Sequence, residues 1–444
     1  MRGIHHTFFV LASIAATRAP AQGAPPAPAA RQTVLRAARM LDVKTGTVIA
    51  NATVVVKGSR IVAAGANVAT PADATVIDLG DVTLLPGLID SHTHLLQNYQ
   101  GRFGNDDPNM LLTVAAMGTV RRALLGVAMG RQDLDAGITT VRDLGNSGLN
   151  GDVALRDAIN AGWVVGPRIV ASTRALAAAG GQFGGLAPEA QKLIDQEYVV
   201  IAGVDDARRA VRQAFYDGAD VIKVIVNTGP RVVSLEEMKV IVEEAHRVGK
   251  RVAAHATDDR ATRIAADAGV NSIEHGYSIP DDALKTMHDK GIFLVPTDYP
   301  ASFYVDALGA SPSGEERQNR LAAAQPFVAK SAERLTRAAK MGVRIAYGSD
   351  EYYDAPGKSR GQSSLLTLQA YQEAGMTPLD VIRAATLNAA DLLGLSESIG
   401  ALDAGKFADI IAVDGDPLKD VKDLQHVRFV MKSGQVIRQD RRTK

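Results

Sequence analysis

The sequence predicts an α/β protein: a (β/α)8 TIM barrel with a small β-sandwich domain built from both chain ends. Two observations carry this prediction. Apolar strand candidates alternate with helical patterns through the middle of the chain, which is typical of parallel strands joined by right-handed crossovers. On either side of this middle, short strand candidates are separated by Gly, Asn, Pro and Asp.

The expected domain boundaries follow from these changes along the chain. Residues 1–31 form a leader, residues 32–85 together with 400–444 form the β-sandwich domain, and residues 86–399 form the barrel. Two strand-rich ends around a different middle indicate one domain built from both. Pro86-Gly87 marks the point where the β domain gives way to the barrel.

The leader reads MRGIHHTFFVLASIAATRAPAQGAPPAPAA. Arg2 supplies a short basic start, residues 7–17 are apolar but too short to span a membrane, and Ala19-Pro20-Ala21 fits a small-residue cleavage site. We interpret these residues as a secretory signal peptide followed by a flexible leader; a disordered extension is the alternative. We therefore expect the mature chain in the periplasm or outside the cell, with no membrane span.

Eight apolar segments predict the strands of the barrel. They are GLIDSHTH, ITTVRDL, RIVAST, VIKVIV, RVAAHA, SIEHGY, FLVPTD and RIAYGSD. Helical patterns such as SLEEMKVIVEEAHRVGK and DDRATRIAADAG lie between most of them. Eight such units over roughly 250 to 300 residues match a (β/α)8 barrel, whose reactive groups gather at the carboxyl ends of the strands. The stretch 173–204 is less regular, and we expect a loop excursion with short helices there.

Composition excludes several classes of function. The 444-residue chain has 49 basic and 49 acidic residues, so it has no net charge with which to attract nucleic acid. It has no cysteine, which excludes disulfides, thiolate nucleophiles and zinc–cysteine sites. Any transition-metal site must therefore use His, Asp, Glu or a modified side chain.

Six polar residues stand near the ends of the predicted barrel strands. They are His92 and His94 in the first strand, Lys223 in the fourth, His255 in the fifth, His275 in the sixth and Asp350 in the eighth. Because residues two apart share one face of a strand, His92 and His94 point the same way. We expect all six side chains to converge at one mouth of the barrel.

Each of these residues alone has an ordinary structural interpretation. A strand histidine is more often a hydrogen-bonded core residue than a ligand, Lys223 can extend to the rim, and Asp350 can cap the next segment. Six such residues at the ends of parallel strands would need six separate explanations. The joint pattern therefore favours a shared functional site.

The motifs around these residues resemble those of the amidohydrolase superfamily of metal-dependent hydrolases. The resemblance covers PGLIDSHTH, the barrel, ATLNAADLLGL and the closing GALDAGKFADIIAVDGDPL, which is nearly everything after the leader. Within the superfamily, GITTVRDLG, GPRIVAS, IEHG and EAGMTPLDVIRAAT are similar to the imidazolonepropionase-like and prolidase-like branch. The stretch ASTRALAAAGGQFGG is similar to bacterial amidohydrolases that hydrolyse the amide bond of ochratoxin A.

The resemblance implies a site for two divalent metal ions, usually zinc. His92, His94 and Asp350 would bind the more buried ion, and His255 and His275 would bind the second. Asp350 would also act as the general base toward the attacking water and carry the proton to the leaving nitrogen.

The resemblance further implies that Lys223 bridges both ions as a carbamate formed with carbon dioxide. A protonated ammonium cannot bind a cation, whereas a buried neutral lysine can add carbon dioxide and present two oxygens. Glu274 is a candidate for orienting a ligand, with an outward-facing strand residue as the equal alternative, and Asp90 is either an orienting or a structural residue.

Substrate specificity is expected on the loops that follow the strands. The candidate substrate contacts are Gln182, Phe183, Arg231, Tyr299 and Tyr352, with Tyr353, Lys358 and Arg360 as further loop residues. For the charged residues, a solvated surface position is the alternative, and aromatic loop residues commonly just pack.

Two loops depart from the pattern of dipeptidases in this branch. Relatives often have Gly-Gly-His-Gly after the third strand, where this chain has Gly180-Gly181-Gln182-Phe183. They also often have His-Gly-x-Asn after the eighth strand, where this chain reads SRGQSS. Both changes remove polar contacts, so the sequence does not predict a strict Xaa-Pro dipeptidase.

The sequence therefore predicts a metal-dependent hydrolase of amide bonds that acts on N-acyl amino acids or small peptides, with ochratoxin A as a candidate substrate. We expect a small-molecule substrate, a homo-oligomer and no nucleic-acid partner. One alternative is a deaminase or a cyclic-amide hydrolase on the same fold. The other is a metal-free scaffold or binding protein on a degenerate barrel.

Overall fold

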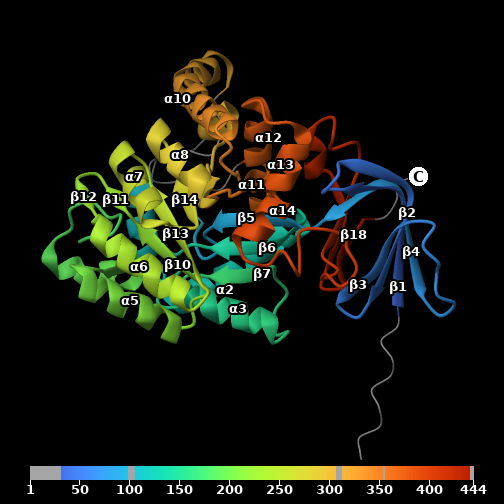
Figure 1. The fold of residues 1–444 in the computed structure, drawn as a ribbon, viewed down its shortest axis with the longest axis horizontal. Helices are drawn as coiled ribbons and strands as arrows, with labels where there is room; N and C mark the ends of the chain where they lie inside the picture. The colour runs from blue at the N-terminus through green and yellow to red at the C-terminus, as the bar shows by residue number, and fades with distance from the viewer. Residues whose placement is uncertain (1–31, 99–105, 307–312, 354–355, 441–444) are drawn as a thin grey trace, which may run out of the picture.

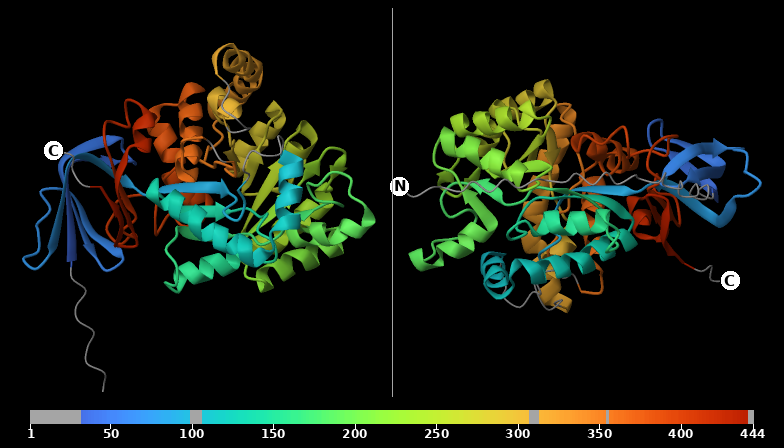
Figure 2. Two further views of the ribbon diagram at one scale, coloured as in Figure 1. Left: turned by 180° about the vertical axis from the view of Figure 1, so that it is seen from behind. Right: turned by 90° about the horizontal axis from the view of Figure 1, so that it is seen from below.

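The computed structural model describes residues 32–98, 106–306, 313–353 and 356–440. Figure 1 shows a helix-covered barrel and, beside it, a β sheet to which both ends of the chain contribute. Figure 2 shows from two further sides that the first and last strands lie together. The predicted signal peptide and leader, residues 1–31, lie outside the described residues.

The β sheet beside the barrel contains seven strands in the order β18-β17-β16-β4-β1-β2-β3. Those strands are β1 (Gln32–Asp42), β2 (Thr47–Lys57), β3 (Arg60–Ala66), β4 (Thr75–Pro86), β16 (Ile410–Val413), β17 (Val427–Lys432) and β18 (Gln435–Gln439). The two chain ends meet where β4 pairs antiparallel with β16, with Leu85 opposite Ile411. The predicted two-sheet sandwich is not confirmed, because hydrogen bonds join all seven strands into one sheet.

Irregularities in the strands bend this single sheet around a core. The pairing of β1 with β4 shifts register on both sides of Ala37, and such bulges bend strands and increase their twist. Leu35, Val54, Leu84 and Phe429, from four different strands, are fully buried in one apolar cluster. One curved sheet thus buries the apolar faces for which the sequence predicted a sandwich.

The barrel strands occupy the predicted positions and pair in parallel. They are β5 (Leu88–Thr93), β6 (Ile138–Asp143), β7 (Arg168–Ala171), β8 (Ala175–Ala177), β10 (Val221–Ile225), β13 (Arg251–Ala256), β14 (Ser272–His275) and β15 (Phe293–Val295). Adjacent strand ends lie level, since Ile225 is opposite His255 and Ala256 is opposite His275.

Two barrel positions are irregular. The third is divided at Thr173, whose φ is 61°: β7 pairs with β6 before it, and β8 pairs with β10 after it. The predicted eighth strand is not a regular strand: segment 344–350 forms one isolated bridge with β15 and makes two backbone hydrogen bonds to β15 and two to β5. Ala346 N donates to Leu294 O at 3.0 Å, and Asp350 N donates to His92 O at 2.7 Å. These bonds close the barrel between β15 and β5.

Helices surround the barrel strands (Figure 1). The helical patterns in the sequence correspond to α6 (Leu235–Arg247) and α7 (Asp259–Ala268). Ser234 and Glu237 form a capping box at the start of α6, and Asp258 caps α7. The remaining helices are α1 (Asp106–Ala116), α2 (Thr119–Asp135), α3 (Gly151–Asn160), α5 (Val204–Tyr216), α8 (Asp281–Lys290), α9 (Ala301–Asp306), α10 (Gly314–Lys340), α11 (Arg360–Ser364), α12 (Leu366–Glu373), α13 (Pro378–Ala384), α14 (Leu387–Leu392) and the short helix η2 (Val421–Gln425).

The stretch 173–204 is a loop excursion with short helices, as expected. It contains η1 (Pro188–Ala190), α4 (Gln191–Glu197) and the edge strand β9 (Tyr198–Val200), which pairs with β8. The sequence did not indicate β9, and it also missed the hairpin of β11 (Asn227–Thr228) and β12 (Arg231–Val232) after β10.

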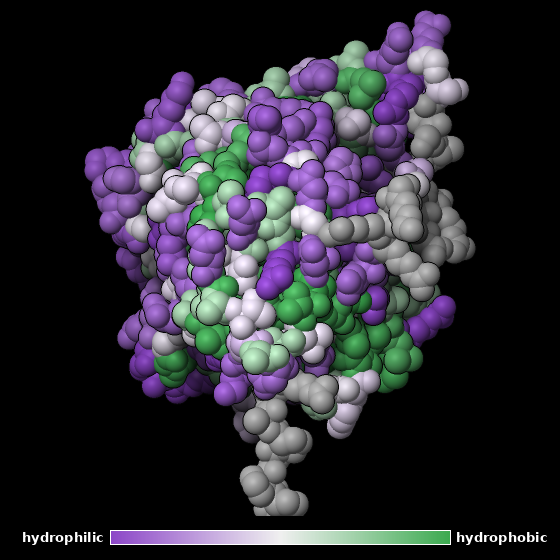
Figure 3. Space-filling model, turned by 90° about the vertical axis from the view of Figure 1, so that its right-hand side faces the viewer, coloured by the Kyte–Doolittle hydropathy of each residue, from purple (hydrophilic) through white to green (hydrophobic). Residues whose placement is uncertain are grey.

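Within the described ranges, no single helix combines the length and apolar character needed to cross a bilayer. Residues 110–116 and 119–135 of α1 and α2 meet that test only together, and the two helices are bent by 117°. Figure 3 shows the face at the β-domain side, where hydrophilic residues predominate and apolar residues occur in separate patches.

Candidate active site

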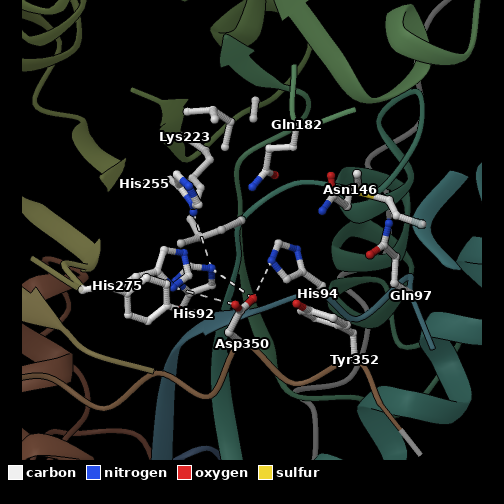
Figure 4. Close-up of a pocket in the computed structure, with 15 residues that line it drawn as sticks. His92, His94, Gln97, Asn146, Gln182, Lys223, His255, His275, Asp350 and Tyr352 are labelled. Atoms are coloured by element: carbon white, nitrogen blue, oxygen red, sulfur yellow. Dashed lines mark hydrogen bonds and ion pairs between the residues drawn. The ribbon is translucent and has the colours of Figure 1, made fainter. Parts of the chain in front are cut away.

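A cavity of about 240 Å³ lies at the carboxyl ends of the barrel strands. Figure 4 shows that all six polar residues expected to converge do line it: His92, His94, Lys223, His255, His275 and Asp350. They come from β5, β10, β13, β14 and the eighth barrel position. Elements far apart in the sequence therefore bring four histidines, one lysine and one carboxylate into a single site.

Asp350 lies among the nitrogen atoms of this cluster. Its Oδ1 is 3.0 Å from His94 Nε2 and 3.5 Å from His92 Nε2, and its Oδ2 is 3.9 Å from His275 Nδ1. The Lys223 Nζ atom lies 3.4 Å from His92 Nε2. Potential ligand atoms of His92, His275 and Asp350 all lie within 4.8 Å of one another, a spacing that suits a bound cation.

Backbone geometry places Asp350 at this position. Its φ of 54° is left-handed, which turns the chain away from the barrel directly after the carboxylate. Asp90 holds the preceding residue, because its Oδ1 accepts from Ser349 N at 3.0 Å and its Oδ2 accepts from Ser349 Oγ at 2.6 Å. Gly348 allows the close approach, since an added Cβ would lie 2.7 Å from His92 Cβ. Asp90 is therefore an orienting residue.

Hydrogen bonds to Nδ1 orient three of the histidines. His92 Nδ1 donates to Glu274 Oε2 at 2.8 Å, and His94 Nδ1 donates to Gly145 O at 2.9 Å. His275 Nδ1 lies 2.8 Å from Thr297 Oγ1. In a neutral imidazole, a proton on Nδ1 leaves the lone pair on Nε2, so His92 and His94 present a ligand atom to the cavity.

Glu274 faces inward and is fully buried, so the outward-facing alternative is wrong. Besides His92, it accepts from the buried guanidinium of Arg142 at 2.9 Å and from the Ser272 hydroxyl. The carboxylate thus has fixed partners on both oxygens, which holds the His92 ring in one orientation.

Replacing Glu274 with glutamine is expected to weaken metal binding about 10- to 100-fold, because the amide orients His92 less strongly than the carboxylate. Titration of the metal-free protein with zinc measures this change. Glu236→Gln, on the exposed face of α6, is the matched control and is expected to bind zinc like the wild type. Unchanged zinc affinity in Glu274→Gln would contradict the orienting role.

Burial sets the protonation states in the cluster. It lowers the pKa of His92 and His275 well below the usual range, and together with the nearby Lys223 it lowers the pKa of His255 to about 3. Burial also lowers the pKa of Lys223 to about 8, although the carboxylates of Glu274 and Asp350 oppose the change. These three histidines are therefore neutral bases with lone pairs at neutral pH.

The donor set fits divalent metal ions. Neutral imidazoles, a carboxylate and an amine of low pKa lie side by side, all within the barrel and mostly buried. Burying several polar groups whose lone pairs have no partner costs free energy, unless a bound cation accepts those lone pairs. His255, whose ring lies 4.6 Å from the ring of His275, extends the donor set beyond the positions around Asp350.

Two of the predicted substrate contacts, Gln182 and Tyr352, line the cavity. Tyr352 packs edge-on against His94, with ring centroids 5.9 Å apart. Several further lining residues were not predicted, because nothing in their local sequence pattern sets them apart. They are Gln97, Met110, Leu144, Asn146, Ala175, Ile225 and Tyr277.

The other three predicted substrate contacts do not line the cavity. Phe183 is buried and packs edge-on against Tyr198. Arg231 instead secures the loop after β8, since its guanidinium donates to the carbonyls of Ala179 and Phe183, each at 2.7 Å. Tyr299 is buried and donates to Glu351 Oε2 at 2.7 Å. Their positions show structural roles in the loops around the site.

The remaining loop residues considered from the sequence also have packing or surface positions. Arg360 is buried rather than solvated, and its guanidinium donates to Thr93 Oγ1 at 2.5 Å beneath the site. Tyr353 packs against Tyr352, with ring centroids 4.7 Å apart. Lys358 is exposed, which agrees with the surface alternative.

Comparison with known families identifies the chain. A model described as the amidohydrolase family matches residues 83–437. The chain belongs to the amidohydrolase family. This amidohydrolase is 32% identical over 385 residues to ochratoxinase from Aspergillus niger, and the match covers 80% of this chain and 75% of the relative. It is 25% identical over 417 residues to imidazolonepropionase from Caldanaerobacter subterraneus subsp. tengcongensis, covering 87% and 90%.

Solved structures agree with this assignment. A Xaa-Pro dipeptidase with methionine bound in its active site is 30% identical to this amidohydrolase, with a TM-score of 0.77 and coverage of 91% of this chain and 99% of the other. The structure of A. niger ochratoxinase is 28% identical, with a TM-score of 0.76 and coverage of 92% and 96%. The resemblance stated from the motifs is confirmed: the protein is a hydrolase that acts on carbon–nitrogen bonds, on a barrel of the TIM type.

Proposed function

We propose that this amidohydrolase hydrolyses the amide bond of N-acyl amino acids or small peptides, in a site that holds two divalent metal ions, zinc in the first instance. The observation that carries the proposal is the convergence of four histidines, Lys223 and Asp350 on one cavity at the barrel mouth. Similarity to an ochratoxinase and to a Xaa-Pro dipeptidase supports amide hydrolysis.

The proposed division of ligands follows the cluster geometry. His92, His94 and Asp350 would hold one ion, since Asp350 Oδ1 lies within 3.5 Å of Nε2 of both histidines. His255 and His275 would hold the second ion. When bound, the two ions would polarise the scissile carbonyl and make the attacking water more acidic.

Lys223 is proposed to bridge the two ions as a carbamate. Its neutral amine would form an N–C bond with carbon dioxide and release one proton, which replaces a neutral group with an anionic carbamate that would offer two oxygen ligands. Burial supports this role by lowering the pKa of Lys223 to about 8, so that a useful fraction of the amine is neutral near physiological pH.

Carbamate formation is expected to increase as the pH rises through about 8, the pKa of Lys223, because only the neutral amine has a lone pair for carbon dioxide. Carbon-13 NMR of protein reconstituted with zinc and labelled bicarbonate at several pH values measures it. Lys223→Arg, which stays protonated, is expected to lack the carbamate signal. The same signal in that variant would contradict modification at Lys223.

Asp350 is proposed as the general base. Burial alone would raise the pKa of its carboxyl, but the nearby His92 and the hydrogen bond from His94 outweigh burial, so the net pKa is lowered. The side chain is therefore ionised at neutral pH and can accept a proton from the attacking water. Its Oδ2, toward His275, can then deliver that proton to the leaving nitrogen.

Aromatic side chains near the cluster support an aromatic group in the substrate. The Tyr277 ring lies 5.5 Å from that of His275 at a tilt of 32°, and it contacts Phe327 on α10 at 5.8 Å. Phe327 in turn contacts Tyr304 at 5.4 Å. Tyr277 and Tyr352 line the cavity itself, and Phe327 and Tyr304 pack behind Tyr277, so aromatic surface lies beside the polar cluster. Ochratoxin A, an amide of an aromatic acid, is a proposed member of this substrate class.

A substrate panel tests the proposed function. Metal-replete protein is incubated with N-acyl aromatic amino acids, N-acyl aliphatic amino acids, dipeptides, ochratoxin A, cyclic amides and aminated heterocycles, and amine or ammonia release is measured. We expect hydrolysis of the N-acyl aromatic amino acids in preference to the aliphatic ones. Activity on cyclic amides or heterocycles alone would favour the alternative hydrolase or deaminase, and absence of bound metal would favour the scaffold.

We also propose that the chain is exported, on the basis of the apolar leader and the small residues Ala19 to Ala21. Amino-terminal sequencing of the mature protein from a periplasmic or culture fraction tests this proposal. A homo-oligomer remains a prediction that sedimentation velocity can check.

A further inference from the structure

Two side-chain amides stand beside the metal cluster without a part in the chemistry described above. Asn146, after β6, and Gln182, after β8, both line the cavity and are half-buried. The hydroxyl of Tyr198 lies 3.2 Å from Asn146 Oδ1 and 3.2 Å from Gln182 Oε1. The single hydroxyl proton of Tyr198 is therefore shared between the two amide oxygens, and the Met110 sulfur lies 3.7 Å from the same hydroxyl oxygen.

The contact with Tyr198 determines which atoms face the cavity. Both amide oxygens are turned toward the phenol, so both NH₂ groups are turned away from it. Figure 4 shows the nitrogen of each amide on the side nearer the histidines. Within the part of the chain that the structure describes, no protein acceptor bonds to Asn146 Nδ2 or Gln182 Nε2. The two NH₂ groups are thus available to an acceptor on a ligand.

A buried ion pair stabilises the part of the cavity wall that carries Asn146. Arg122 on α2 pairs with Glu197, the residue before Tyr198, and both side chains are fully buried. The same guanidinium donates to the backbone carbonyl of Asn146 and, at 3.2 Å, to that of Leu96. One side chain thus fixes the segments that carry Asn146 and Tyr198, which preorganises the amides.

The glycine loop before Gln182 packs on the same phenol. Gly181 has a φ of 58°, and an added Cβ would lie 2.2 Å from the Tyr198 ring. Phe183, on the other side of Gln182 in the sequence, also packs edge-on against the Tyr198 ring, with ring centroids 5.7 Å apart. The tight packing on both sides of Gln182 leaves its side chain directed into the cavity.

We propose that Asn146 and Gln182, held by Tyr198, form a clamp that binds the free carboxylate of the substrate while its amide bond lies at the metal cluster. The inference rests on the proposed hydrolysis of N-acyl amino acids and names the part of that site which recognises the amino-acid end. A carboxylate can accept from two NH₂ groups at once, and hydrogen bonds to a charged acceptor are stronger than neutral ones. Asn146, Gln182 and Tyr198 are therefore specificity-determining residues.

Binding of a matched pair of non-hydrolysable ligands tests the clamp. N-benzyl-L-phenylalanine carries a carboxylate, and N-benzylphenethylamine lacks only that group. Isothermal titration calorimetry with metal-replete protein measures Kd for both ligands in the wild type, in Gln182→Met and in Tyr198→Phe. Gln182→Met keeps the side-chain length, and Tyr198→Phe keeps the ring that packs on Gly181. Gln213→Met, on the exposed face of α5, is the control.

We expect the wild type and the control to bind the acid at least about tenfold more tightly than the amine, since hydrogen bonds to a charged group have this strength. Gln182→Met and Tyr198→Phe are expected to lose most of this preference while they bind the amine as before. Gln182→Glu, which places a second carboxylate on the wall, is expected to bind the acid more weakly still.

Equal affinity of the wild type for the two ligands would overturn the clamp, and so would an unchanged preference in Gln182→Met and Tyr198→Phe. These outcomes differ from failure of the proposed function. If no N-acyl amino acid is hydrolysed but the variants lose the carboxylate preference, the clamp stands and the proposed reaction is wrong. If hydrolysis is observed with no carboxylate preference, the reaction stands and the clamp is wrong.

Discussion

Replacing Lys223 with alanine is expected to remove bound metal and to lower kcat/KM by more than about a thousandfold, because the contribution of metal ions to catalysis is several kcal/mol. Lys223 is buried within the ligand cluster, 3.4 Å from His92 Nε2, so its loss removes the bridge and leaves a cavity between the two proposed ions. Metal content by mass spectrometry and steady-state kinetics on the best panel substrate measure the two effects.

Small carboxylic acids provide the specific control for this variant. Acetate or propionate can enter the space left by the lysine and supply two bridging oxygens, so we expect partial recovery of metal binding and activity in Lys223→Ala. Lys239→Ala, on the exposed face of α6, should resemble the wild type and should not respond to the acids. Full activity of Lys223→Ala without added acid would contradict the bridging role.

Asp350→Asn is expected to lower kcat by about 10²- to 10⁴-fold, the usual contribution of a general acid–base residue. Asparagine is nearly isosteric and tolerates the left-handed φ of 54° at this position, so the fold is expected to be retained. The amide cannot accept the proton that the Asp350 carboxylate takes from water. Kinetics combined with thermal unfolding of the same preparation separates lost catalysis from lost folding.

The pH profile distinguishes a base from a mere ligand at position 350. In the wild type, protonation of the Asp350 carboxylate, whose pKa is lowered, is expected to reduce kcat/KM at acidic pH. An asparagine has no such titration, so we expect the residual activity of Asp350→Asn to lack this acid limb. An acid limb of the same midpoint in the variant, or turnover near that of the wild type, would contradict the role as general base.

The barrel was predictable because its signals are local and repeated. Alternating strands and helices gave the positions of β5, β10, β13 and β14, and the polar residues at their ends followed from the parallel arrangement. The irregular backbone at the eighth barrel position could not be predicted in the same way. RIAYGSD has the apolar pattern of a strand, but its backbone makes only two hydrogen bonds to β15 and two to β5, and this pairing depends on the tertiary contacts with those strands.

The chain ends show a similar limit. Their strand-rich texture predicted one β domain built from both, and strands from both ends do share a sheet. Whether such strands form one sheet or two depends on bulges and curvature, such as the register shifts around Ala37 in β1. These shifts lie in the pairing of β1 with β4, and the sheet continues to β16, more than 300 residues further along the chain, so a local sequence pattern does not predict them.

Within the site, only the residues that belong to recognisable sequence motifs could be predicted. The six clustered polar residues stand out because histidines are few in this chain and these lie at strand ends, whereas Asn146 and Tyr277 belong to ordinary loop sequence. Left-handed backbone at Asn146, His275 and Thr297 aims side chains at or near the cavity, and this conformation is unusual for residues other than glycine. Gly145 and Gly276 stand beside Asn146 and His275, but the three left-handed residues themselves are not glycine, so their conformation does not follow from the sequence.

Loop aromatics and charges were the least predictable group. Phe183, Tyr299 and Arg231 have the residue types of substrate contacts, but the structure uses them to pack and fasten the loops that position other residues. Residue type specifies what a side chain can do, and only the fold decides the direction in which it points.

Anomalous diffraction at the zinc absorption edge, from crystals of the zinc-loaded protein, tests most directly whether the six clustered side chains hold two metal ions. We expect two anomalous peaks, one among His92, His94 and Asp350 and the other beside His255 and His275, joined by electron density that extends from Lys223. A single peak, peaks outside this ring of residues, or no peak at full zinc loading would contradict the binuclear site.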